Sequence, residues 1–105
     1  MVGEIYLAKI YFTDLSSYKI RPVLILRDIE NDVICLQLTS QFKSDRIIIS
    51  ETDLIDGKLK KSSLVVVPKN FTIHKSILHK YLGKISDSKL EKINDIFCKS
   101  IGCKK

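Results

Sequence analysis

The sequence is poor in the residues that usually mark a cofactor loop or a membrane anchor. Its 105 residues include four glycines and two prolines, and the glycines are scattered rather than gathered into a phosphate-binding loop. No apolar run approaches the length needed to cross a bilayer. The N-terminus also lacks a basic segment followed by an apolar stretch, so we expect no signal peptide, no membrane contact and a cytoplasmic location.

Cysteine is also scarce, and its spacing excludes two classes of small protein. Cys35 lies inside an apolar run, whereas Cys98 and Cys103 are five residues apart near the C-terminus. An odd number of cysteines without a C-x-x-C pair suggests neither a disulfide framework nor a zinc site. We therefore expect thiols in a reducing compartment, and neither a metal ion nor a cofactor.

The size and composition indicate one soluble domain spanning residues 1–105, since 45% of the residues are hydrophobic and 29% are charged. The net charge of +6 is unevenly spread: residues 1–35 contain 4 Lys and Arg against 5 Asp and Glu, which leaves 14 against 7 for the remainder. Such an excess attracts polyanions, nucleic acid among them. A lysine-rich solvated surface explains it equally well.

Short apolar runs rich in Ile, Val and Tyr predict strands rather than helices. The first run is apolar on both faces, which requires cover on both sides, as in a small barrel or a dimer interface. Pro68 is expected to end the fifth strand because proline cannot donate to a ladder. Residues 51–57 indicate an acidic loop, and a helical turn is expected at Lys75–His79. The expected strands are Glu4–Phe12, Arg21–Glu30, Asp32–Thr39, Arg46–Ser50, Ser62–Val67 and Tyr81–Ile85.

One amphipathic helix is predicted after Ser86, which can cap it, and Asp87, which complements the positive helix end. Gly102 suits its C-terminus. Its apolar stripe favours core packing over a ligand site and comprises Leu90, Ile93, Ile96, Phe97 and Ile101. The expected fold is mainly β with α: a small, partly closed, SH3-like antiparallel barrel of five to six strands plus a C-terminal helix.

Two strand ends carry the candidate site. A hairpin of the second and third runs places Arg21 and Thr39 at the same edge of the sheet. Arginine is a rigid, permanently charged donor suited to phosphate oxygens, and Pro22 restricts the backbone before it. Taken alone, each residue is more simply a polar strand end. His74 and His79 have no companion at metal-ligand spacing and are interpreted as surface or structural residues.

Four short motifs in order resemble the PemK/MazF family of toxin endoribonucleases. Gly3-Glu4-Ile5-Tyr6-Leu7-Ala8 is similar to the family's opening strand, and Arg21-Pro22-Val23-Leu24-Ile25-Leu26 to its Arg-Pro element. Leu38-Thr39-Ser40-Gln41 resembles the strand end that carries the family threonine. Gly83-Lys84-Ile85-Ser86, with the apolar spacing that follows it, resembles the C-terminal strand and helix.

The resemblance implies a homodimer that cleaves single-stranded RNA without a metal ion, by attack of the 2′-hydroxyl on the adjacent phosphate, and that a cognate antitoxin protein neutralises. It assigns catalysis to Arg21 and Thr39. Ser16–Lys19 matches the family's loop beside the RNA groove, although it contains no histidine, so the general acid and base stay unassigned. The expected RNA-binding residues are Ser16, Ser17, Tyr18, Lys19, Ser40, Gln41 and Lys43.

A different class of function also fits this sequence. The same barrel can serve as a non-catalytic binding module for a protein or an RNA partner. The missing loop histidine favours this alternative, and so does the run Leu64-Val65-Val66-Val67, which lacks the Arg/Asp pair that some family members carry.

Overall fold

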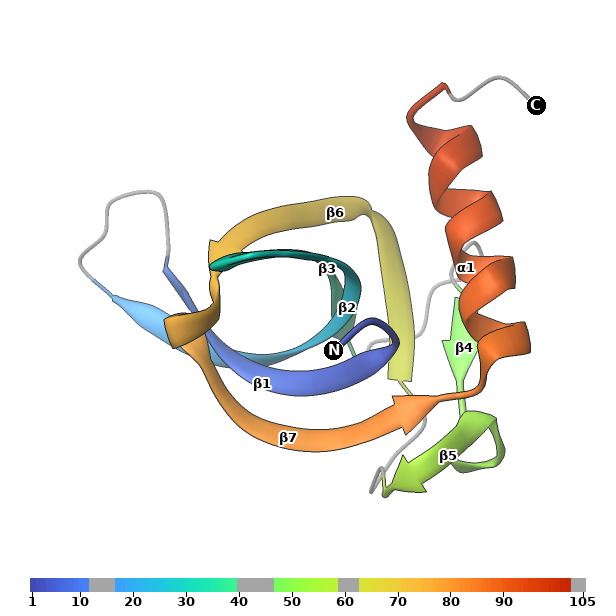
Figure 1. The fold of residues 1–105 in the computed structure, drawn as a ribbon, viewed down its shortest axis with the longest axis horizontal. Coiled ribbons are helices and arrows are strands. Elements are labelled where there is room, and N and C mark those ends of the chain that lie inside the picture. Colours follow the sequence, from blue (N-terminus) through green and yellow to red (C-terminus); the bar gives the residue numbers. More distant parts are fainter. Residues whose placement is uncertain (12–16, 40–46, 59–62, 103–105) are drawn as a thin grey trace.

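The computed structural model describes residues 1–11, 17–39, 47–58 and 63–102, which form one antiparallel sheet followed by a helix (Figure 1). Mainly β structure with a C-terminal helix is therefore confirmed. The elements in chain order are β1 (Glu4–Tyr11), β2 (Tyr18–Ile29), β3 (Asp32–Thr39), β4 (Ile47–Ile49), the 3-10 turn η1 (Glu51–Asp53), β5 (Leu54–Gly57), β6 (Ser63–His74), the 3-10 turn η2 (Lys75–Ile77), β7 (Leu78–Ile85) and α1 (Asp87–Ser100).

The sheet is strongly curled but open. Its seven strands follow the order β4-β6-β3-β2-β1-β7-β5, so β6 and β7 are separated by three other strands. Only the three residues of η2 connect them. Such a short connection brings the end of β6 close to the start of β7, which bends the intervening strands into the curve seen in Figure 1. None of the described residues pairs β6 with β7, so the barrel is not closed.

The first core lies between the sheet and α1. Its central helix residue, Ile93, is fully buried, and Leu90 and Phe97 pack beside it. Ile96 and Ile101 of the predicted stripe are instead 43% and 59% exposed, which corrects the expectation for those two positions. The buried residues of the first core are Ile5, Leu24, Leu26, Leu36, Leu38, Ile49, Val65, Ile85 and Ile93.

The second core occupies the opposite side of the same central strands. It contains the fully buried residues Ala8, Val23, Ile25, Val33 and Cys35. Because the sheet curls, its own outer parts cover this side without a helix. The partly buried residues that pack against the second core are Tyr6, Ile10, Phe71, Ile73, Ile77 and Leu78. The sequence correctly predicted that β1 needs cover on both faces.

Pro68 does not end a strand, contrary to the sequence-based expectation, because β6 runs from Ser63 to His74. The pairing of β3 with β6 jumps from Leu36↔Asn70 to Gln37↔Val66, so the three residues between Val66 and Asn70 have no partner in that ladder. Proline is tolerated at such an irregularity because its missing N–H removes no ladder hydrogen bond.

The expected acidic loop contains η1 and the short strand β5, which raises the strand count above the five to six predicted. At Gly57, φ is +79°, and a Cβ atom would lie 2.1 Å from the carbonyl oxygen of Leu82. Only glycine allows the backbones of β5 and β7 to approach this closely. The sequence showed the turn residues but not the strand, because β5 is only four residues long.

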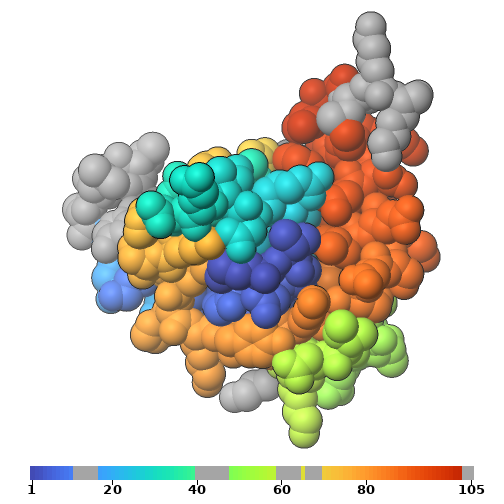
Figure 2. Space-filling model, viewed as in Figure 1, coloured from blue at the N-terminus to red at the C-terminus, as the bar shows by residue number. Residues whose placement is uncertain are grey.

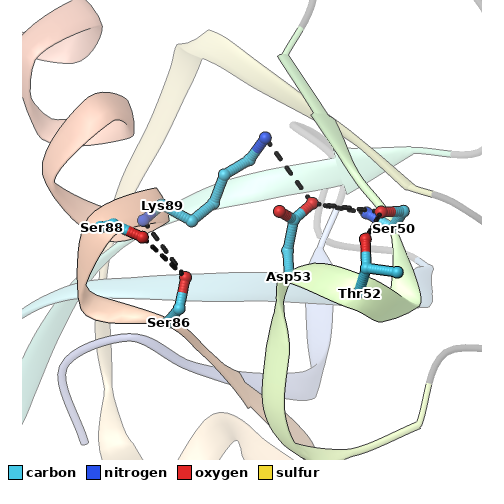
Figure 3. A network of polar contacts seen from close by, with 6 residues as sticks. All are labelled: Ser50, Thr52, Asp53, Ser86, Ser88 and Lys89. Carbon is cyan, nitrogen blue, oxygen red and sulfur yellow. Dashed lines mark hydrogen bonds and ion pairs between the residues drawn. The ribbon is translucent and has the colours of Figure 1, made fainter.

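A polar network connects η1 to the start of α1 (Figure 3). Ser86 caps the helix as predicted, since its Oγ accepts a hydrogen bond from the Lys89 backbone N–H at 3.3 Å. The Asp53 carboxylate accepts a hydrogen bond from the Ser50 backbone N–H at 2.9 Å and lies 3.6 Å from the Lys89 ammonium. The network fixes the helix entry against the segment before β5.

The N-terminal residues close one end of the curled sheet between β2 and β7. The Gly3 N–H donates to the Ile25 carbonyl at 2.8 Å, and the Gly3 carbonyl accepts from the Ile85 N–H at 3.0 Å. In the space-filling view these residues are surrounded by the β2–β3 turn, β7 and α1 (Figure 2). No helix within the described ranges is long and apolar enough to span a membrane.

The cysteines depart in part from the expectation of thiols. Cys35 is a buried thiol in the second core, and burial raises its pKa to about 12. Cys98 is disulfide-bonded, with its partner outside the described residues.

Candidate RNA-contacting site

The pairing of β1, β2 and β3 locates the two proposed catalytic residues. Arg21 on β2 lies opposite Ala8 on β1. On its other side, β2 pairs with β3 through Val23↔Gln37. The β2–β3 ladder ends at this pair, and Arg21 and Thr39 each lie two residues beyond it, toward the same end of the hairpin. The three strands are adjacent in Figure 1, so both residues lie toward the same end of neighbouring strands.

Both side chains also project from the same face of the sheet. Ala8, the cross-strand partner of Arg21, belongs to the second core, and paired residues share a face. On β3, Leu36 and Leu38 belong to the first core. Because side chains alternate along a strand, Thr39 points to the side of the second core. Arg21 is exposed and Thr39 is half-buried at this edge.

The two arginines of β2 have different environments. Arg27 donates to the Leu26 carbonyl at 2.7 Å and to Asn94 Oδ1 on α1 at 3.2 Å, so it is held against the helix. Arg21 has no hydrogen bond or ion pair with any residue that the structure describes. Its guanidinium is therefore available to an anionic ligand, and it remains charged at every physiological pH.

The predicted loop residues divide between the two faces of the sheet. Lys19 pairs with Ile10, which packs against the second core, so it shares the face of Arg21. Tyr18 lies on the other face, where the Lys9 ammonium is 5.1 Å from its ring centroid. Ser17 is exposed just before β2. Only Lys19 of these three is placed beside the proposed catalytic pair.

Four other predicted RNA-binding residues lie outside the described residues, namely Ser16, Ser40, Gln41 and Lys43. Their predicted roles stay predictions. The catalytic roles of Arg21 and Thr39 also stay predictions, although their positions on β2 and β3 are described.

Gln37 is a fourth residue of this site and was not among those predicted from the sequence. Its side chain lies on the face of Arg21 and Thr39, because it pairs with Val23 of the second core. It is half-buried. The signal was present in the sequence: Gln37 is the one polar residue in a run, Val33–Leu38, that is otherwise apolar on both faces. We call Lys19, Arg21, Gln37 and Thr39 the rim site.

The histidines lie elsewhere. Nδ1 of His74 accepts a hydrogen bond from the Ser76 N–H at 3.1 Å and thereby caps η2. His79 is exposed at the irregularity of β7, between the residues that pair with Leu7 and Ala8. His74 thus has the structural role that its sequence context favoured, and His79 is a surface residue. Within the described ranges, no three His, Cys, Asp or Glu side chains gather in a metal-binding arrangement.

The rim site supplies a permanent positive charge, a second cation, a hydroxyl and an amide near the start of β2 and the end of β3. Arg21 and Lys19 can bind phosphate oxygens, while Thr39 and Gln37 can accept or donate hydrogen bonds. The rim site contains no histidine and no carboxylate. Its groups can hold a phosphate, and proton transfer would need another group.

The sequence matches one family model over residues 1–101, described as "PemK-like, MazF-like toxin of type II toxin-antitoxin system". The chain belongs to this family. The match spans the sheet and the helix, and it confirms the resemblance found in the four short motifs. No curated protein matches the sequence.

Solved structures similar to this PemK/MazF-family chain confirm its fold. The toxin MazF-mt6 of Mycobacterium tuberculosis aligns with a TM-score of 0.76 and 19% identity over 97% of this chain and 99% of that one. An endoribonuclease in complex with its cognate antitoxin, from a mycobacterial species, aligns with a TM-score of 0.73 and 23% identity over 100% and 95%. A further mycobacterial endoribonuclease aligns with a TM-score of 0.73 and 22% identity over 97% of this chain and 90% of that one.

Proposed function

We propose that this family member is a toxin endoribonuclease that cleaves single-stranded RNA without a metal ion. The proposal is carried by membership of the PemK/MazF family and is supported by the positions of Arg21 and Thr39, which project to the same side of the sheet and each lie two residues beyond the last β2–β3 pair. Two solved relatives with the same fold are endoribonucleases, which supports the reaction class.

In this mechanism the RNA provides its own nucleophile. The 2′-hydroxyl attacks the adjacent phosphorus, the bond from phosphorus to the 5′-oxygen of the next nucleotide breaks, and a cyclic phosphate and a 5′-hydroxyl result. Arg21 stabilises the additional negative charge of the phosphorane. Thr39 orients a phosphate oxygen. Arginine stays protonated at neutral pH, so it does not accept the proton of the 2′-hydroxyl.

The proposed partners follow from the family assignment and the charge. Single-stranded mRNA is attracted by the net charge of +6 and contacts Lys19 at the rim. A cognate antitoxin with an acidic, apolar segment covers the site, as one similar endoribonuclease is bound by its own antitoxin. The active form is a cytoplasmic homodimer, in which the exposed Ile96 and Ile101 of α1 are available for an interface.

The test is cleavage of a long RNA by purified protein in EDTA. Cleavage in EDTA is expected, and a chimeric substrate with a single 2′-deoxy nucleotide at the cut site should bind but remain whole. Cleavage of that chimera would rule out attack by the 2′-hydroxyl. Abolition of the activity by EDTA would rule out the metal-independent mechanism.

A second function, the non-catalytic binding module, is favoured by one observation: the rim site contains no histidine or carboxylate that could serve as the general base. It predicts an RNA or protein complex in which the RNA stays intact under every condition above. The same experiment, with a gel-shift measurement added, therefore separates the two functions.

A further inference from the structure

Gln37 is a polar side chain in a position that the fold otherwise gives to apolar residues. Its neighbours on that face are Val23, across the strand pair, and Cys35, two residues earlier on β3, and both are fully buried. A glutamine amide in such surroundings loses water contacts, which costs free energy unless another partner replaces them. The packing of the second core therefore gives no reason for an amide here.

The amide of Gln37 has no hydrogen-bond partner in the described part of the chain. In the described part of the chain, every fully buried side-chain nitrogen or oxygen atom has a hydrogen-bond partner. Because the Gln37 amide has none, its atoms are not fully buried and still contact solvent. They are thus accessible and unsatisfied by the protein. An accessible amide that no protein group satisfies is a hydrogen-bonding site for a ligand.

The ligand is set by the position of Gln37 in the rim site. It lies two residues before Thr39 on β3, roughly 7 Å along the strand and on the same face. A phosphate held by Arg21 and Thr39 would therefore place a flanking nucleotide within reach of the amide. A neutral amide adds little to stabilising the charged phosphate. It can instead donate and accept together, which is how glutamine recognises the edge of a base, adenine above all.

We propose that Gln37 determines which base is accepted beside the scissile phosphate, and that this base is adenine; the inference rests on the proposed endoribonuclease function. Single-stranded RNA suits this reading because its unstacked bases expose their hydrogen-bonding edges. The amide of Gln37 is half-buried, so a base edge that binds it exchanges water for hydrogen bonds to the amide. A base that cannot satisfy both the donor and the acceptor of the amide is then rejected.

The test is the cleavage pattern on a randomised single-stranded RNA pool, read by sequencing the new ends. The wild-type protein should show adenine enriched at one position beside the cut. Gln37→Met, which keeps the length of the side chain but removes the amide, should lose that enrichment at this position alone and slow cleavage of the best substrate about ten- to a hundredfold. Gln37→Glu should shift the preference toward cytosine, whose amino group donates to a carboxylate.

The matched control is Asn70→Leu. Asn70 carries the same functional group on β6 and is exposed, but it pairs with Leu36 of the first core and so lies on the opposite face. Its cleavage pattern should equal that of the wild type. Thermal unfolding of each variant checks the fold, and a change of base preference in Gln37→Glu is a result that loss of stability cannot produce.

The outcomes separate the two proposals. Cleavage with an identical base pattern in wild type, Gln37→Met and Gln37→Glu overturns the role of Gln37 and leaves the nuclease intact. Cleavage by the wild type without any base preference also overturns the role of Gln37 and leaves the nuclease function intact. Intact RNA with every protein overturns both the endoribonuclease function and the inference built on it.

Discussion

The central sheet has an apolar core on each of its two sides, and different elements cover the two cores. The side of the first core is covered by α1, whose Ile93 is inserted among side chains from most of the strands. On the side of the second core, the described residues that pack against it come from β1, β6, β7 and the 3-10 turn η2, which the curl of the sheet brings over it. The proposed rim site lies on this side, at the end of the sheet where β2 begins and β3 ends. The proposed function is therefore on the side of the sheet opposite α1.

The first experiment removes a buried side chain from the helix-covered first core. Ile93→Ala removes a fully buried side chain from the first core and should lower the free energy of unfolding by about 2–5 kcal/mol. Urea denaturation followed by circular dichroism measures it. Ile96→Ala, on the same helix but 43% exposed, is the control and should change stability far less. Equal losses in the two variants would contradict the assignment of the helix stripe.

The second experiment removes the arginine of the proposed rim site. Arg21→Ala should reduce RNA cleavage about a hundred- to a thousandfold, comparable to removing one donor from an oxyanion-type site, and should leave the unfolding midpoint nearly unchanged because Arg21 is exposed. Arg27→Ala on the same strand is the matched control. It should retain cleavage, because Arg27 is bonded toward α1. Full activity in Arg21→Ala would remove the residue from the mechanism.

The third experiment sharpens the description of the second core through pH. Burial raises the pKa of Cys35 to about 12, whereas an unfolded thiol titrates near 8.5. Between these values the unfolded state binds fewer protons than the folded state, so stability falls as pH rises. At pH 10 the free energy of unfolding should be about 2 kcal/mol lower than at pH 7 because of this thiol.

Cys35→Val is the control for this titration, since valine occupies a similar volume and carries no proton. The difference in unfolding free energy between the wild type and this variant, measured in urea from pH 7 to pH 10, isolates the thiol. A difference that stays constant over that range would show that Cys35 is more accessible than the structure indicates.

The smallest effect concerns the β5–β7 contact. The Tyr81 hydroxyl donates to Asp56 Oδ2 at 2.6 Å, and this hydrogen bond, followed by partial burial, raises the pKa of Tyr81 to about 12. Asp56→Asn should return the pKa toward 10, measured by absorbance at alkaline pH, with Tyr81→Phe identifying the signal. An unchanged titration would mean that the hydrogen bond is not populated in solution.

Much of this architecture was readable from local patterns. The strands β1 and β3, the Ser86 cap and the family membership were predicted because each depends on a short run of neighbouring residues. Two errors, at Pro68 and at β5, had the opposite cause. Pro68 is tolerated because β6 leaves the ladder there, and β5 exists because Gly57 approaches the backbone of Leu82. Both depend on partners distant in sequence.

The sequence by itself determined the residue types at the rim, a basic strand entry at Arg21 and a hydroxyl at the end of β3, since these follow from the order of residues along the chain. Only the tertiary structure decided which face each side chain occupies. Lys19 was brought beside Arg21 and Tyr18 was turned away from it, while Gln37 joined Thr39. The physical reason is the two-residue alternation of strands: the register of pairing, which is set by the packing of both cores, assigns every side chain to one face.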